Sequence, residues 1–137
     1  SGASYKDTLS MLYFSTKAYV SALILAEEVY KKVPANTEAM ARAAECYDEL
    51  GDPKTAVGLF EQVVPKTKNP YHIYKLANLL GVLKMDAKNY TGAKTDFQEA
   101  LKMFPDFTGA KQNLEACEKA LKGGTKTPAK TPVKPKG

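Results

Sequence analysis

The chain has 137 residues, of which 44% are hydrophobic and 26% charged, which suits one folded domain followed by a tail. Lys and Arg number 20 against 15 Asp and Glu, but residues 1–121 contain 15 of each kind. The net charge of +5 therefore comes from the C-terminal residues 122–137 alone, through Lys122, Lys126, Lys130, Lys134 and Lys136, and it does not indicate a nucleic-acid-binding surface on the repeats. A membrane span is also excluded, because no apolar run approaches the roughly 20 residues that a bilayer requires.

Apolar periodicity and helix-capping residues predict a series of helices along the folded part. They are expected at roughly 4–16, 19–33, 37–50, 53–64, 70–86, 90–104 and 108–122. Ser4 and Asp7 are spaced as in a capping box at the start of the first helix. Asp52 and Asn69 are each followed by proline, a pattern that is typical of a helix start. They predict where the fourth and fifth helices begin.

Three segments of the chain are related to one another by shifts of 34 and then 37 residues. The shifts align apolar residues with apolar ones, as in Ala22/Ala56/Ala93, Leu12/Cys46/Leu83 and Val29/Val63/Ala100. A repeat of this length is a supersecondary unit that buries its apolar face only against its neighbours. The sequence therefore predicts a stack of helix pairs with one continuous core.

These residues resemble the tetratricopeptide repeat, a pair of antiparallel helices of about 34 residues. The matching positions are Tyr13, Ala22, Pro34, Ala43-Ala44, Tyr47, Ala56, Phe60, Leu80-Gly81, Ala93, Phe97, Ala100-Leu101 and Pro105. The resemblance implies an all-α fold, a right-handed superhelical stack of antiparallel helix pairs, over residues 1–122. It places the repeats at about 3–36, 37–73 and 74–107 and a capping helix at 108–122. Residues 123–137 are rich in Lys, Pro and Thr, and we expect this tail to be disordered.

In this family the first helices of successive repeats line a concave groove that holds a segment of another protein. By the resemblance, the groove positions are Asp7, Met11 and Phe14 in the first unit, Glu38, Glu45, Asp48 and Glu49 in the second, and Lys75, Asn78, Val82 and Met85 in the third. Helical spacing independently places the four acids of the second unit near one face. An acidic groove centre suits a segment that carries Lys or Arg. The alternative, weighed equally, is an ordinary solvated helix face.

Some members of the family clamp the C-terminal carboxylate of heat-shock chaperones with basic and amide side chains of the groove. In this chain the corresponding places of the first two repeats hold Ser4, Thr8, Glu38 and Arg42. Only Lys75 in the third repeat suits such a clamp, so a carboxylate clamp is not expected.

A second surface is indicated on the second helix of the first unit. Val20 and Ile24 lie four residues apart, where the other repeats have no large apolar side chain. If this stripe is exposed, it predicts self-association into a homo-oligomer. The alternative is that the N-terminal residues or the opposite helix cover it.

The sequence contains no constellation typical of an enzyme, a cofactor site or a metal site. Its one histidine, His72, is expected at the surface, and Cys46 and Cys117 are expected to be buried packing residues too far apart for a disulfide. We therefore expect a non-enzymatic adaptor or scaffold without a cofactor, whose partner is another protein. The rival interpretations are a self-associating module and, third, an accessory protein whose basic tail contacts nucleic acid or an anionic surface. A nucleic-acid contact is not favoured, because the tail has no aromatic residues on which bases could stack.

Overall fold

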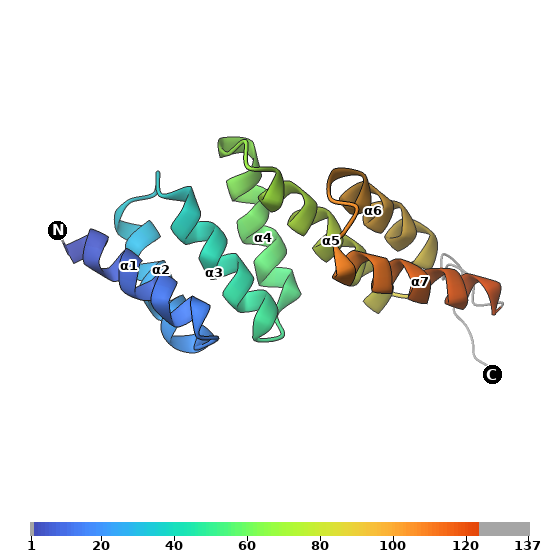
Figure 1. Ribbon diagram of the computed structural model, residues 1–137, viewed down its shortest axis with the longest axis horizontal. Coiled ribbons are helices and arrows are strands. Elements are labelled where there is room, and N and C mark those ends of the chain that lie inside the picture. Colours follow the sequence, from blue (N-terminus) through green and yellow to red (C-terminus); the bar gives the residue numbers. More distant parts are fainter. Residues whose placement is uncertain (1, 124–137) are drawn as a thin grey trace. The chain divides into compact units, whose positions relative to one another are not determined.

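The computed structural model describes residues 2–123, and the side chains from Tyr5 onward. Across these residues the chain forms α-helices, one short 3-10 turn and no strand (Figure 1). In chain order the elements are α1 (Gly2–Ser15), α2 (Tyr19–Lys32), α3 (Thr37–Glu49), α4 (Pro53–Val63), η1 (Val64–Lys66), α5 (Pro70–Asp86), α6 (Tyr90–Met103) and α7 (Thr108–Lys122). The predicted helices are all present, and each predicted end lies within about two residues of the observed one, the usual margin for helix boundaries. Of the tail expected to be disordered, residues 124–137 lie outside the described residues.

Helix capping follows the sequence at the later helices but not at the first one. The Asp52 carboxylate accepts a hydrogen bond from the Thr55 backbone N–H at 3.2 Å, and the Asn69 side chain accepts one from the Tyr71 N–H at 3.0 Å. The capping box predicted at Ser4 is wrong, because α1 begins two residues earlier, at Gly2. Its acidic member, Asp7, is not used as a cap residue, since its carboxylate is engaged by a guanidinium of α3.

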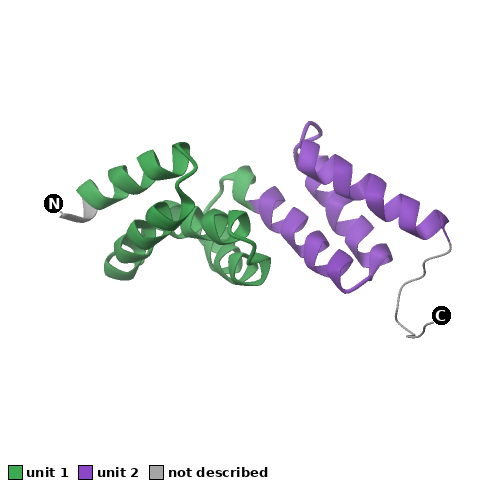
Figure 2. Ribbon diagram, turned by 90° about the horizontal axis from the view of Figure 1, so that it is seen from below, with its two compact units in different colours: residues 1–72 green, residues 73–137 purple. Residues whose placement is uncertain are grey.

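The chain divides into two compact units, residues 1–72 and residues 73–137, with the division inside α5 (Figure 2). In unit 1, α1 packs on α2, α2 on α3, and α3 on α4. Fully buried alanines, among them Ala22, Ala26 and Ala43, lie where these helices cross. The larger side chains of Phe60 and Val63, on α4, are also fully buried. Small side chains let helix axes approach closely and large ones fill the remaining gaps, as interior packing density requires.

Unit 2 is built around Phe97, which is fully buried with Ala93 and Cys117. Helix α6 packs on α7, and α5 meets α6 at Gly81. A Cβ atom added at Gly81 would lie only 2.5 Å from Cε1 of Phe97. The absence of a side chain at Gly81 therefore leaves room for the Phe97 ring. Lys84 of α5 and Asp96 of α6 form an ion pair of 2.8 Å beside this contact.

The two cysteines are free thiols buried one in each unit, as the sequence predicts for packing residues. Burial and the nearby Glu45 carboxylate raise the pKa of Cys46 to about 11. The pKa of Cys117 is raised as well, chiefly by burial. Both groups are therefore thiols and not thiolates at neutral pH.

Candidate functional site

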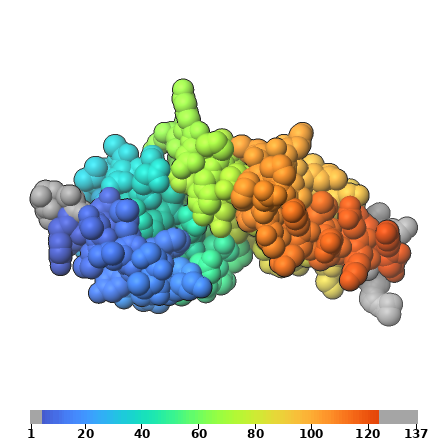
Figure 3. All heavy atoms as spheres, in the orientation of Figure 1, coloured from blue at the N-terminus to red at the C-terminus, as the bar shows by residue number. Residues whose placement is uncertain are grey.

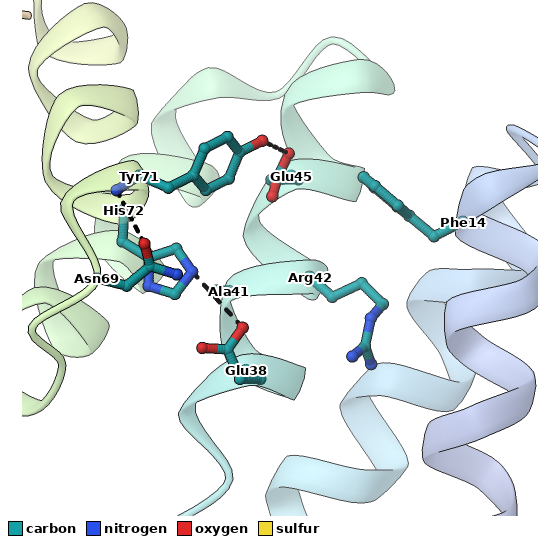
Figure 4. A pocket seen from close by; sticks show the side chains of 8 residues that line it. All are labelled: Phe14, Glu38, Ala41, Arg42, Glu45, Asn69, Tyr71 and His72. Carbon is teal, nitrogen blue, oxygen red and sulfur yellow. Dashed lines mark hydrogen bonds and ion pairs between the residues drawn. The ribbon is translucent and has the colours of Figure 1, made fainter. Parts of the chain in front are cut away.

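Unit 1 contains a hollow of about 140 Å³ between α1, α3 and the beginning of α5 (Figure 4). Its lining residues are Phe14, Glu38, Ala41, Arg42, Glu45, Asn69, Tyr71 and His72. Phe14, Glu38 and Glu45 are groove positions predicted from the sequence. The fold thus brings residues of the first two repeats to one site.

One side of the hollow is fixed by an ion pair that joins α1 to α3. Nη1 of Arg42 lies 2.7 Å from Oδ1 of Asp7, and the two side chains are only 11% and 27% exposed. The same nitrogen lies 3.5 Å from Oγ of Ser10, whose hydroxyl donates to the Ala22 carbonyl oxygen at 2.9 Å. The guanidinium is therefore engaged by a carboxylate of its own protein. This arrangement does not favour the capture of an acidic ligand.

The opposite side is formed by the first turn of α5. The Tyr71 hydroxyl donates a hydrogen bond of 2.6 Å to Oε1 of Glu45, as Figure 4 shows. Hydrogen bonds to an ionised carboxylate are short and strong, so this contact orients the Glu45 side chain along the wall. Glu45 is consequently a positioned group and not a freely rotating surface acid.

The prediction that His72 lies at the surface is wrong. It is 2% exposed and packs against Phe60 and Tyr71, with ring centroids 6.1 and 5.8 Å apart. Its Nε2 lies 3.8 Å from Oε1 of Glu38, and its Nδ1 has no hydrogen-bond partner among the described residues. The histidine is therefore part of the hollow's wall and not a surface residue.

The reason for this error is the length of α5, which has 17 residues where α3 has 13. The extra turn at its beginning carries Tyr71 and His72 into the hollow. A sequence signal for this exists, because a shift of 34 residues, applied without the three extra ones, aligns His72 with Glu38. Asn69, Tyr71 and His72 are site residues that the sequence analysis did not include.

The hollow and its surroundings are acidic. Glu38, Glu45 and Asp7 bring three carboxylates to this region and Arg42 brings one guanidinium, a formal charge of −2. The Glu38 side chain is 63% exposed, so its carboxylate faces solvent at the rim of the hollow. A concave site with this balance attracts cationic groups.

The other predicted groove residues lie elsewhere. In unit 1, Met11 is an exposed residue of α1, Glu49 is exposed and Asp48 half-buried at the end of α3, and none of them lines the hollow. In unit 2, Lys75 lies over the ring of Phe107, with Nζ 5.9 Å from its centroid, and the Asn78 side chain accepts a hydrogen bond from Asn113 at 3.3 Å. Val82 and Met85 pack against the buried cluster around Phe97.

The apolar stripe on α2 is open to solvent. Val20 and Ile24 are 59% and 54% exposed, and Leu12 of α1 is exposed to a similar extent. Figure 3 shows the outer surface of α1 and α2, in blue, on the face turned towards the viewer. Neither the N-terminal residues that the structure describes nor the opposite helix covers the two side chains.

Two further observations concern the described residues only. No group of three or more His, Cys, Asp or Glu side chains in this part of the chain could hold a metal ion. None of its helices combines the length and the apolar character that crossing a membrane requires.

Comparison with known proteins bears on the fold. Residues 13–79 match the family model described as tetratricopeptide repeat. The first tetratricopeptide repeat domain of Spaghetti (RPAP3), solved with the HSP90 peptide SRMEEVD, is 20% identical, with a TM-score of 0.67 over 88% of this chain and 93% of that one. The search of curated proteins found no match.

Two further solved structures show the same likeness. The Sgt2 domain from Aspergillus fumigatus is 19% identical, with a TM-score of 0.64 over 99% of this chain and 89% of that one. The OM64 domain from Arabidopsis is 20% identical, with a TM-score of 0.68 over 86% and 95%. Together these matches show that the chain has the all-α tetratricopeptide fold of stacked helix pairs.

Proposed function

Because this chain belongs to the tetratricopeptide repeat family, whose domains mediate contacts between proteins, we propose that it is an adaptor that holds a segment of another protein at the hollow of unit 1. The observation that carries the proposal is the convergence of Phe14, Glu38 and Glu45 on one concave site. Helical-repeat folds act through such surfaces and are generally not enzymes. No cofactor is needed for this function.

The charge of the site indicates the kind of segment. The hollow region has a formal charge of −2, and its one guanidinium is already engaged by Asp7. The peptide in the Spaghetti structure, SRMEEVD, ends in a run rich in acidic residues. A segment of that kind would be repelled by Glu38 and Glu45, so we expect the partner segment of this chain to carry Lys or Arg.

The size of the site favours a peptide over a small molecule. Pockets for drug-sized ligands have volumes of roughly 300–1,000 Å³. The hollow, at about 140 Å³, has room for one side chain. The remainder of a bound segment would run over the exposed surface of α3.

Capture from native lysate by the full chain tests this proposal. The variant Glu45→Lys with Asp48→Lys should lose a partner that binds at the acidic face, because the local charge is reversed. The variant Glu61→Lys with Glu115→Lys makes the same change of charge at exposed positions outside the hollow and should retain the partner. Equal capture by all three proteins would show that the acidic face of α3 has no part in binding.

A second candidate function rests on the exposure of Val20 and Ile24. An apolar stripe in solvent favours association with a second copy of the chain. Sedimentation velocity should then show a mass that rises with concentration, and Val20→Ser with Ile24→Ser should abolish the rise. A monomer mass at every concentration would rule out self-association. The third candidate, contact of the tail with nucleic acid, concerns residues outside the described part and is tested by deleting residues 124–137.

A further inference from the structure

We propose that the outer stripe of α1, formed by Tyr5, Leu9 and Leu12, is a docking surface for the same stripe of a second copy of this chain. Helical spacing places the three residues on one face of α1, at the N-terminal edge of unit 1 (Figure 1). Tyr5 and Leu12 are 66% and 58% exposed, and Leu9 is half-buried. Phe14, which lines the hollow, lies on the other side of the helix. The contact is therefore separate from the binding of a partner segment at the hollow.

The repeat shows what covers this stripe elsewhere in the chain. A shift of 34 residues moves the stripe onto three fully buried positions of α3: Ala39, Ala43 and Cys46. Two further repeats along the chain, the same positions of α7 hold Ala110, Leu114 and Cys117. In each case the preceding helix packs on these positions, because α2 packs on α3 and Phe97 of α6 packs in one cluster with Leu114 and Cys117. No helix precedes α1 in the described part of the chain, and its stripe is open.

The repeat also shows the direction of a covering helix. Residues 33–36 join α2 to α3, and residues 104–107 join α6 to α7. Connections this short join antiparallel neighbours. The equivalent stripes therefore receive an antiparallel helix in both units. Tyr5, Leu9 and Leu12 are larger than most residues at those positions, so two α1 helices would interdigitate their side chains at an axial separation of about 8–10 Å.

The first and the last described helices differ in their outer surfaces. The end helices of a repeat stack need a polar outer face to remain soluble. Helix α7 has such a face, because it exposes the charged residues Lys111, Glu115, Lys119 and Lys122. From Tyr5 onward, the exposed side chains of α1 are all uncharged: Tyr5, Thr8, Met11, Leu12, Tyr13 and Ser15. The outer face of α1 therefore suits a covered surface, and that of α7 suits solvent.

The charges of α1 fit a second copy. A contact across a two-fold axis brings the same surface patch together from both copies, so an unpaired charge within it would be buried without a partner. The charged residues of α1 are Lys6 and Asp7, and both are already paired, with Glu28 at 3.0 Å and Arg42 at 2.7 Å. The stripe itself is neutral. The outer face of α7 is a poor partner surface, because its charged side chains would lose their hydration.

The arrangement of the pair follows from the stripe. When two α1 helices lie antiparallel, the two-fold axis passes near Leu9, and Tyr5 of one copy faces Leu12 of the other. A helix of 14 residues is about 21 Å long. Two such helices bury less than the roughly 1,600 Å² of a standard interface, so we expect a weak dimer.

The stripe of Val20 and Ile24 on α2 is a rival surface for self-association. The equivalent residues of α4 are Lys54 and Gly58, which are exposed. At Val20 and Ile24 the repeat therefore predicts solvent, whereas at Leu12 it predicts a covering helix. The two surfaces can be separated by single substitutions.

Sedimentation velocity of the full chain, from about 10 µM to about 1 mM, should show a mass that rises from monomer towards dimer. Leu12→Lys should weaken association by more than tenfold, because a dimer would bury two ammonium groups without partners. The matched control is Val20→Lys, at a position that is 59% exposed, and it should associate as the unmodified chain does. Far-ultraviolet circular dichroism checks that both variants are folded.

A charge-pair variant tests the antiparallel arrangement. Tyr5→Lys with Leu12→Glu in one chain places opposite charges across the two-fold axis at both ends of the helix pair. Association should then be stronger than with either change alone. Within one chain the two positions lie about 10 Å apart along the helix, so the introduced charges do not pair there. Tyr5→Lys with Leu12→Lys is the matched control and should stay monomeric.

Several outcomes would overturn the inference. They are a monomer mass at every concentration, association that Leu12→Lys leaves unchanged, and association lost in Val20→Lys only, which would assign the contact to α2. A charge-pair variant that associates no better than its single changes would overturn the antiparallel pairing. A monomeric chain that loses a lysate partner through Leu12→Lys would show that another protein covers the stripe, and this also refutes the dimer. Glu45→Lys with Asp48→Lys tests the hollow and should leave self-association intact, so either proposal can fail without the other.

Discussion

Replacing Gly81 by alanine tests how closely α5 and α6 pack in unit 2. A Cβ atom at this position would lie 2.5, 2.8 and 2.8 Å from three atoms of the Phe97 ring, which is fully buried. Carbon atoms attract one another best at about 3.5–4.0 Å, so the ring or the helix has to move. Because Phe97 is surrounded by Ala93 and Cys117, the ring has little room to withdraw.

The magnitude follows from two opposing terms. Gly→Ala inside a helix stabilises it by about 1 kcal/mol through backbone propensity. Overpacking in a well-packed core costs about 1–3 kcal/mol. The matched control is Gly58→Ala in α4, where nothing lies within 4 Å of the added Cβ atom. The control should be stabilised by about 1 kcal/mol, and Gly81→Ala should be less stable than the control by about 1–3 kcal/mol.

Urea and thermal unfolding of the full chain, followed by far-ultraviolet circular dichroism, measure the difference. One kcal/mol corresponds to roughly 3–6 °C in Tm for a folded part of this size. Gly58→Ala should therefore unfold at a higher temperature than Gly81→Ala, with the unmodified chain as the reference. If Gly81→Ala stabilises the chain as much as Gly58→Ala does, the contact between α5 and the Phe97 ring is not as close as described and the reasoning fails.

Three further predictions concern side chains of unit 1. Asp7→Asn should lower the free energy of unfolding by about 1–3 kcal/mol, because it leaves the largely buried guanidinium of Arg42 without its carboxylate, and unchanged urea unfolding would contradict this. The hydrogen bond that the Tyr47 hydroxyl donates to Glu27 raises the pKa of Tyr47 to about 12, so the folded state holds this proton more tightly than the unfolded state. Stability from this bond should be fully present below pH 10 and fall as the pH rises towards 12, and Tyr47→Phe should lose that part of the pH dependence. Cys46, with its pKa raised to about 11, should react with a thiol reagent at pH 8 only on unfolding, and rapid labelling of the native chain would show that the site is open.

The sequence by itself determined the repeat architecture. The helix starts at Asp52 and Asn69 can be predicted from the sequence, because capping is a local interaction between a side chain and backbone groups two or three residues away. The recurrence of Ala22, Ala56 and Ala93 predicted helix crossings, and all three residues are fully buried. Both signals depend on short-range spacing along the chain.

The tertiary structure alone decided how the site is composed. Asp7 was predicted as a capping residue, but it pairs with Arg42, 35 residues away, and no local pattern specifies such a partner. His72 was predicted at the surface because a single polar residue at a helix start is usually solvated, yet the extra turn of α5 places it against Phe60. Hydrogen bonds and burial between separate repeats depend on the exact length of each helix. A three-residue difference in one repeat therefore decides which side chains form the wall of the hollow.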